Sequence, residues 1–272
     1  MKGRLYFLLA LPVMAVLGQI LPGTIMLALA QPVTECDGPD RMTEIDFPLR
    51  QVTRAIAAKR LNILVLGAGS SQLPGTAGAK ASYPARLQEA LAAKLPGVEV
   101  RVATDVKPKR TAAEMVKTLG PSLAAAKPAL MIWQTATVDA MQSVEPDQFS
   151  HALDKGIKIA RSAGADVIFI NPQYSPRTES MIALATYVEV LRWVALQHET
   201  PLFDRFNLMK TWADLGTFDL YSATKKIDMA ERVHDCLGRL LADLVLEASK
   251  VSVPNSDGGQ EPTKGSVQEP GK

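Results

Sequence analysis

The chain has 272 residues, enough for one α/β domain with a large hydrophobic core. Its composition, 47% hydrophobic and 21% charged, is that of an ordinary globular protein. The formal net charge is only +2 and no long basic run occurs, which argues against a nucleic-acid-binding protein, so no nucleic-acid partner is expected.

The first thirty residues form a segment of their own. Lys2 and Arg4 precede an apolar run over residues 5–30, which ends in the small-x-small pattern ALA before Gln31. This pattern predicts a secretory signal peptide. The run is also long enough to be an uncleaved membrane anchor, but two prolines and two glycines interrupt it and favour cleavage. We expect an exported protein, periplasmic or secreted, with anchoring in the inner membrane as the alternative; a membrane is a partner only if residues 1–30 are retained.

The chain contains two cysteines, Cys36 and Cys236. Because an exported protein meets an oxidising compartment, an even count favours a disulfide between them. The alternative is two unrelated thiols, one of them in the core.

Apolar strands alternate with amphipathic helices along the chain. The first strand is the branched run that starts at Leu61 and stops at the GAGSS sequence of residues 67–71. Residues 72–82 and 104–110 are expected to be loops, and Thr111 with Glu114 forms a capping-box pattern that predicts a helix start. The other predicted strands cover residues 98–102, 128–134, 165–170 and 201–203, and the predicted helices cover residues 48–60, 82–95, 146–163, 179–197 and 229–248.

This alternation predicts right-handed βαβ units, with helices on both faces of one parallel sheet. Ligands of such sheets bind at the carboxyl ends of the strands, so the turn at residues 67–71 is the expected place for a site. The tail over residues 251–272 has almost no large apolar residue and is predicted to be disordered.

Several segments, in order and spacing, resemble the exported bacterial branch of the SGNH/GDSL hydrolase superfamily. They are residues 43–49 (TEIDFPL), 81–87 (ASYPARL), 132–134 (IWQ), 171–177 (NPQYSPR), more loosely 205–209 (RFNLM), and 236–242 (CLGRLLA). The resemblance implies one domain over residues 31–250, a flavodoxin-like three-layer α/β/α sandwich with about five parallel strands. It also implies ester hydrolysis, often of acetyl groups on carbohydrates, by a serine, a histidine and an aspartate, with a glycine N–H and an asparagine side chain as oxyanion donors.

The serine and the two oxyanion donors of the family are substituted here. Aligning the turn after the first strand places Gly69 at the position of the serine, with Ser70 and Ser71 one and two residues later. Counting places Pro108 at the oxyanion glycine, and proline has no N–H to donate. Val138 falls at the oxyanion asparagine and carries no polar group.

The aspartate and the histidine of the family are substituted as well. Counting back from Cys236 places Lys225 at the aspartate and Asp228 at the histidine. His234 lies six residues late, and its helical position relative to the apolar face predicts that it lies at the surface. His151 and His198 are also expected to face solvent.

Four further residues are candidates for binding. Lys107 and Lys109 form a basic loop near the expected site and could meet an anion, although a solvated turn is the ordinary interpretation. Tyr174 and Arg177 could line a pocket near the strand ends, whereas Trp133 is better explained as a core residue. No phosphate-binding glycine motif and no His/Cys cluster occurs, so neither a cofactor nor a metal is expected.

Two hypotheses follow. The first is an exported SGNH-fold protein that has lost esterase activity and binds a glycan or a protein partner of the cell envelope. The second is a divergent serine esterase, acting on carbohydrate esters through Ser70 or Ser71 with His234 as the base.

Overall fold

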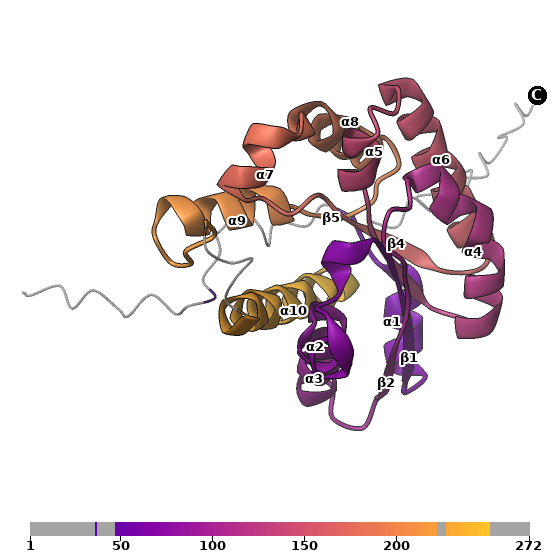
Figure 1. Cartoon of the computed structure of the whole chain (residues 1–272). Helices are drawn as coiled ribbons and strands as arrows, with labels where there is room; N and C mark the ends of the chain where they lie inside the picture. Colours follow the sequence, from indigo (N-terminus) through magenta and orange to yellow (C-terminus); the bar gives the residue numbers. More distant parts are fainter. Residues whose placement is uncertain (1–35, 37–46, 222–226, 251–272) are drawn as a thin grey trace, which may run out of the picture. The chain divides into compact units, whose positions relative to one another are not determined.

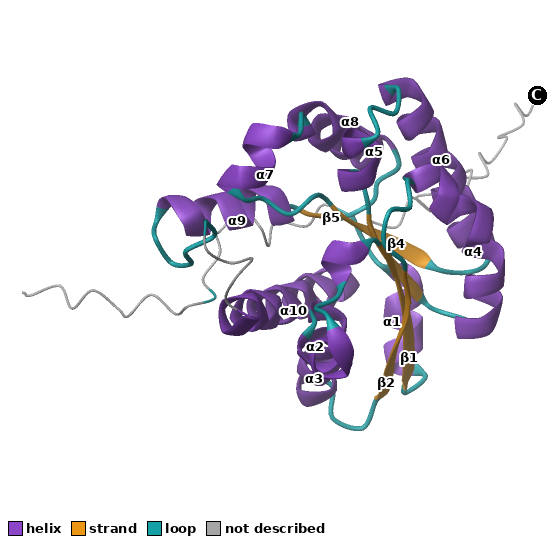
Figure 2. Ribbon diagram, viewed as in Figure 1, coloured by secondary structure: helices purple, strands orange, loops and turns teal. Residues whose placement is uncertain are grey.

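Five parallel strands form one sheet in the order β2-β1-β3-β4-β5 (Figures 1 and 2). The computed structural model describes Cys36, residues 47–221 and residues 227–250. The strands are β1 (Arg60–Gly67), β2 (Glu99–Val106), β3 (Leu130–Gln134), β4 (Asp166–Ile170) and β5 (Leu202–Phe203). This order is that of the flavodoxin-like doubly wound fold, as predicted.

The helices cover both faces of the sheet because the central strands are apolar on both sides. Alternate residues of β1 point into two separate cores: Ile63 and Val65 into one, Leu64 and Leu66 into the other. The first core is closed by α1 (Arg50–Ala57), α3 (Tyr83–Lys94), α9 (Arg205–Asp214) and α10 (Ile227–Lys250). The second is closed by α4 (Ala112–Ala126), α5 (Thr137–Met141), α6 (Pro146–Ser162) and α8 (Leu184–Gln197). The result is the predicted three-layer sandwich.

Several local predictions are confirmed. The side chain of Thr111 accepts a hydrogen bond from the N–H of Glu114, and the Glu114 carboxylate accepts one from the N–H of Thr111, so the capping box starts α4 as expected. Trp133 is fully buried in β3, in agreement with its interpretation as a core residue.

Three local predictions are wrong. The region 72–82 is not only a loop, because it contains α2 (Gly75–Ala81); a short 3-10 helix, η2 (Gly69–Ser71), directly precedes it. Strand β2 continues four residues beyond 102, since its pairing with β1 extends as far as Gly67 and Val106. The helix predicted over 179–197 is two helices, α7 (Pro176–Met181) and α8, separated by an extended Ile182.

The predicted disulfide is present. Cys36 and Cys236 are bonded, with their Cα atoms 4.9 Å apart, and the bridge joins positions 200 residues apart in the sequence. Such a bond is compatible with an exported protein. Among the described helices, none is long and apolar enough to cross a membrane. The predicted signal or anchor (residues 1–30) and the tail (251–272) lie outside the described residues.

Candidate functional site

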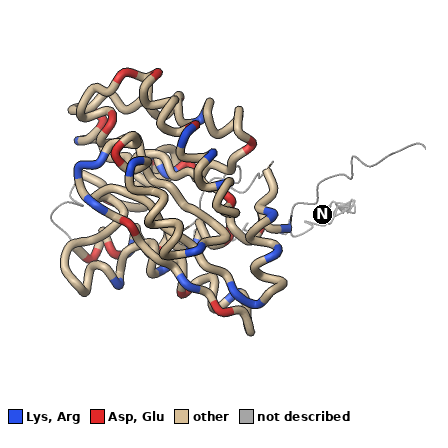
Figure 3. Tube along the Cα trace, turned by 90° about the vertical axis from the view of Figure 1, so that its right-hand side faces the viewer, with Lys and Arg blue, Asp and Glu red and all other residues tan. Residues whose placement is uncertain are grey.

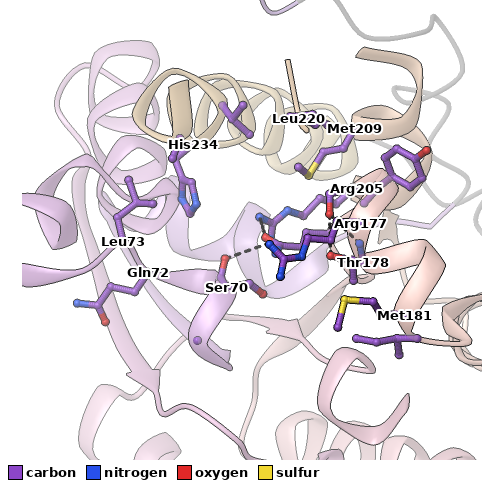
Figure 4. Close-up of a pocket in the computed structure, with 17 residues that line it drawn as sticks. Ser70, Gln72, Leu73, Arg177, Thr178, Met181, Arg205, Met209, Leu220 and His234 are labelled. Atoms are coloured by element: carbon purple, nitrogen blue, oxygen red, sulfur yellow. Dashed lines mark hydrogen bonds between the residues drawn. The ribbon is translucent and has the colours of Figure 1, made fainter. Parts of the chain in front are cut away.

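A cavity of about 540 Å³ lies at the carboxyl ends of the strands. Its walls come from the turn after β1, from the segment that follows β4, and from helices α7, α9 and α10 (Figure 4). This is the edge of the sheet where the sequence predicts a site.

The turn after β1 places two neighbouring serines differently. The Ser71 hydroxyl is fully buried and donates to Gln134 Oε1 at 2.6 Å, while it accepts from the Tyr83 hydroxyl at 3.3 Å. Gly67 makes this packing possible, since a Cβ there would lie 2.1 Å from Ser71 Oγ. Ser70 instead lines the cavity, and its hydroxyl accepts from Gln134 Nε2 at 2.5 Å.

A buried arginine lies beside Ser70. Arg205 is only 1% exposed, yet it lines the cavity (Figure 4). Its guanidinium donates to Ser70 O, Gln134 Oε1 and Gln173 Oε1, each at 3.2 Å, and lies 6.0 Å from the centre of the Tyr83 ring. All three acceptors are neutral, and no carboxylate pairs with Arg205 within the described part of the chain. The positive charge is therefore buried without a countercharge there.

The ends of β4 and β5 position this arginine. Arg205 is the first residue of α9, and Asp204 caps that helix by accepting from the N–H of Asn207. Asn171, directly after β4, donates to Asp204 at 2.6 Å and accepts from the N–H of Phe206 at 2.8 Å. Because these bonds fix the first turn of α9 from both sides, the Arg205 side chain is directed toward the turn after β1.

His234 is buried, not exposed as the sequence predicted. It is 5% exposed and lines the cavity. The reason is that α10 packs against α3 as well as the sheet, so its buried face is wider than expected and includes Leu237 and Leu241, three and seven residues after His234. Gly238 allows this close packing, since a Cβ there would lie 2.5 Å from Arg86 Cβ. His198 is partly buried and contacts Asp154 at 2.7 Å, whereas His151 is exposed as predicted.

The imidazole of His234 is held in one tautomer. Nδ1 accepts a hydrogen bond from the N–H of Tyr83 at 3.0 Å, and the two rings stack. Burial, together with the positive charge of Arg205, lowers the pKa of His234 to about 3. The ring is therefore neutral at physiological pH, and since Nδ1 is the acceptor, the single proton lies on Nε2.

Burial also fixes the charge states of the neighbouring groups. It raises the pKa of the Tyr83 hydroxyl to about 12, so the phenol stays protonated. It lowers the pKa of Arg205 to about 10, which still leaves the guanidinium charged at neutral pH. The cavity therefore contains one buried cation and no buried base of ordinary strength.

The five residues that the sequence assigns to the family's catalytic positions do not all line this cavity. Gly69 lines it, and a Cβ on Gly69 would lie 3.8 Å from Pro108 Cβ, so these two are neighbours. Val138 lies in α5 and packs against the second core. Asp228 is exposed in the first turn of α10, and Lys225 lies outside the described residues.

Of the four predicted binding residues, two line the cavity and two lie outside it. Tyr174 and Arg177 line the cavity, Tyr174 buried and Arg177 exposed. Lys107 and Lys109 are exposed and do not line it; the Lys107 ammonium lies 3.8 Å from the Asp105 carboxylate. Across the described ranges, no cluster of His, Cys, Asp or Glu could hold a metal ion.

Sequence reasoning missed the two residues that connect the site, Gln134 and Arg205. Gln134 bonds to both serines and to Arg205. A polar residue at the end of an otherwise apolar strand is a signal for Gln134, because that position faces the expected site. Arg205 gives no comparable signal, since its burial depends on elements far away in the sequence.

The sheet order, the helical layers and the cavity at the strand ends are those of the SGNH/GDSL hydrolase fold. The profile of the Non-GDSL lipase-like family matches residues 35–251, and the chain belongs to this family. No curated protein matches the sequence significantly.

Solved structures of esterases and lipases share the fold at low identity. A two-domain esterase (CEX) active on acetylated mannans, co-crystallised with mannopentaose, is similar with a TM-score of 0.61 and 14% identity, over 77% of this chain and 56% of that one. A lipase/acylhydrolase from Enterococcus faecalis has a TM-score of 0.52 and 21% identity, over 67% and 94% of the two chains. A catalytic mutant of Axe2, an acetylxylan esterase from Geobacillus stearothermophilus, has a TM-score of 0.53 and 16% identity, over 67% of this chain and 93% of that one.

Proposed function

We propose that this chain is a non-hydrolytic binding protein of the cell envelope, which holds its ligand in the cavity where active SGNH relatives carry out catalysis. The observation that carries the proposal is the hydrogen bond from the Tyr83 N–H to His234 Nδ1. A general base must accept the serine proton on Nε2, and a histidine bound in this way already carries its proton there.

The acid–base properties of His234 support the same conclusion. A catalytic base is most effective when its pKa lies near the working pH, and burial beside Arg205 lowers the pKa of His234 far below that range. In serine hydrolases a carboxylate orients the base by accepting from Nδ1–H, but here Nδ1 is itself an acceptor.

The two serines lack the surroundings of a nucleophile. Ser71 is fully buried, and its hydroxyl already donates to Gln134 and accepts from Tyr83. Ser70 reaches the cavity, but its hydroxyl accepts from the Gln134 amide, and none of the described side chains accepts its proton. A serine without a base is a weak nucleophile.

The proposed cellular location and the kind of ligand rest on more general features. The predicted signal segment and the disulfide support export, to the periplasm or beyond it. The sequence predicts a glycan or a protein partner as ligand. The walled cavity of about 540 Å³ favours a small molecule or one residue of a larger ligand over a folded protein surface.

One observation favours the alternative, a divergent esterase: Ser70 and His234 line the same cavity. The test is hydrolysis of p-nitrophenyl acetate and butyrate by the purified chain, together with labelling by a fluorophosphonate and peptide mapping. We expect no hydrolysis above buffer and no labelled serine. Hydrolysis that Ser70→Ala abolishes, while Ser180→Ala outside the cavity leaves it unchanged, would establish the esterase instead.

A further inference from the structure

The cavity combines a buried positive charge with an apolar wall. Arg205 and Arg177 are the two cationic residues that line it, and no acidic residue among those described does so. Six larger aliphatic side chains also line it, beside neutral polar residues such as Gln72, Gln173 and Thr178; they are Leu73, Met181, Ile182, Met209, Leu220 and Val233. Figure 3 shows basic and acidic residues interspersed along the described chain, so the positive character of the cavity is a local feature.

The charge of Arg205 is incompletely satisfied. Its three acceptors are neutral oxygens, and Nε, which is also buried, has no hydrogen-bond partner in the described structure. A buried charge that lacks a countercharge is costly, and an anion entering the cavity would reduce that cost. A guanidinium fits carboxylate and phosphate oxygens equally well, because its N–H groups form a planar fork.

Two more groups are suitably placed for the same ligand. Arg177 is exposed at the cavity, and none of the described acidic residues pairs with it. The Ser70 hydroxyl accepts from Gln134 and keeps its own proton available for a ligand oxygen. Figure 4 shows Ser70, Arg177 and Arg205 near the centre of the view, with Leu73 to their left and Met209 above them.

We propose that the ligand of this cavity is an amphiphilic anion, in which a carboxylate or phosphate group binds beside Arg205 and an apolar body lies against the aliphatic wall. The inference rests on the proposed function, because it names the chemical class that a non-hydrolytic site of this shape would hold. It can nevertheless fail separately, since it is tested by binding and not by turnover.

The experiment is calorimetric titration of the purified full chain with four probes. Octanoate and octyl phosphate carry the same chain on two kinds of anion, octyl glucoside carries it on a neutral sugar, and inorganic phosphate has no chain. We expect at least one octyl anion to bind about tenfold or more tightly than octyl glucoside, which corresponds to one charge-assisted hydrogen-bonded contact in a buried site. Inorganic phosphate should bind more weakly than octyl phosphate, and the order of the two octyl anions identifies the headgroup.

A near-isosteric variant isolates the charge. Gln134→Glu would place a carboxylate next to Arg205, where Gln134 Oε1 already lies 3.2 Å from the guanidinium. We expect this internal countercharge to weaken binding of the octyl anion about tenfold or more, and to change octyl glucoside binding by no more than about two- to threefold, the part that replacing the Gln134 amide donor to Ser70 would contribute. Arg177→Gln, at an exposed position, should weaken binding of the octyl anion about two- to threefold. This loss of affinity should be smaller at high salt, because salt screens exposed charges.

Two results would overturn the inference. Equal affinity of the wild-type chain for octyl anions and octyl glucoside would show that the buried charge does not select the ligand; this comparison needs no variant and decides the matter even if Gln134→Glu does not fold. Unchanged anion binding by a folded Gln134→Glu protein would show that the anions bind elsewhere. Hydrolysis of nitrophenyl esters alone would contradict the proposed function without touching either comparison.

Discussion

The backbone N–H of Tyr83 donates to Nδ1 of His234 at 3.0 Å, across 151 positions of sequence. This bond joins the start of α3 to α10 and fixes the proton of the imidazole on Nε2. The only histidine that reaches the cavity in the described structure is thus held in the tautomer that donates toward it. This tautomer supports the proposal of a non-hydrolytic site, since the general base of a serine hydrolase accepts the serine proton on Nε2.

The stability of the protein should depend on pH through His234. Its folded pKa, about 3, lies below the ordinary value of 6.5 because of burial and the charge of Arg205. The unfolded chain therefore binds more protons between these values, so this contribution is fully present above pH 6.5 and is lost as the pH falls toward 3. We expect a loss of about 2 kcal/mol in the free energy of unfolding between pH 7 and pH 5.

Urea unfolding of His234→Asn at the same pH values provides the comparison. The asparagine oxygen can still accept from the Tyr83 N–H but does not titrate, so most of this pH slope should disappear. His151→Asn, at an exposed position, should keep the wild-type slope. An equal slope in wild type and His234→Asn would contradict the buried, neutral state of His234.

A serine at Gly69, the position that the sequence assigns to the family nucleophile, should not by itself produce hydrolysis. Gly69→Ser places a hydroxyl at the cavity, beside Pro108, but supplies neither a base on Nε2 of His234 nor an oxyanion donor at Pro108. Catalytic groups act as a unit, so one of them alone contributes little. We expect nitrophenyl ester hydrolysis by Gly69→Ser to equal that of wild type; a clear increase would show that a base and donors are already in place.

The disulfide should make a large contribution to stability, because it closes a loop of 200 residues. In the chain-entropy model such a bridge is worth about 5 kcal/mol, and engineered cases often give less. We expect reductant to lower the urea midpoint of the wild-type chain. Cys36→Ser, which lacks the bridge, should have a low midpoint that reductant does not change. A wild-type midpoint that is insensitive to reductant would contradict a stabilising bond.

Two helical glycines should respond differently to the same substitution. A Cβ on Gly156 in α6 would lie 2.2 Å from the buried Trp133 ring, whereas a Cβ on Gly120 in α4 would meet nothing within 4 Å other than its own neighbours in the helix. Gly156→Ala should therefore cost about 1–3 kcal/mol by overpacking. Gly120→Ala should change stability by less than about 1 kcal/mol, because the gain in helix propensity is opposed by contact of the new Cβ with Pro121, the next residue of the helix. Urea unfolding checks both, and a stabilised Gly156→Ala would contradict the tight packing of α6 on β3.

The sequence alone determined the features that depend on neighbouring residues or on simple counting. The apolar run from Leu61 to Gly67 predicts a strand buried on both faces, and Thr111 with Glu114 predicts the start of α4, because a strand's period and a helix cap act over a few residues. The two cysteines and the expected export predict the bond between Cys36 and Cys236.

Only the tertiary structure decided the chemistry of the cavity. Whether His234 is buried or exposed depends on how closely α10 packs against α3, and the spacing of apolar residues along α10 alone does not reveal this. The buried charge of Arg205 depends on Ser70, Gln134 and Gln173, which lie 32 to 135 positions away in the sequence. The pKa of a histidine and the cost of a buried arginine are set by the groups around them in space, and that is why these properties follow from the fold and not from the order of the residues.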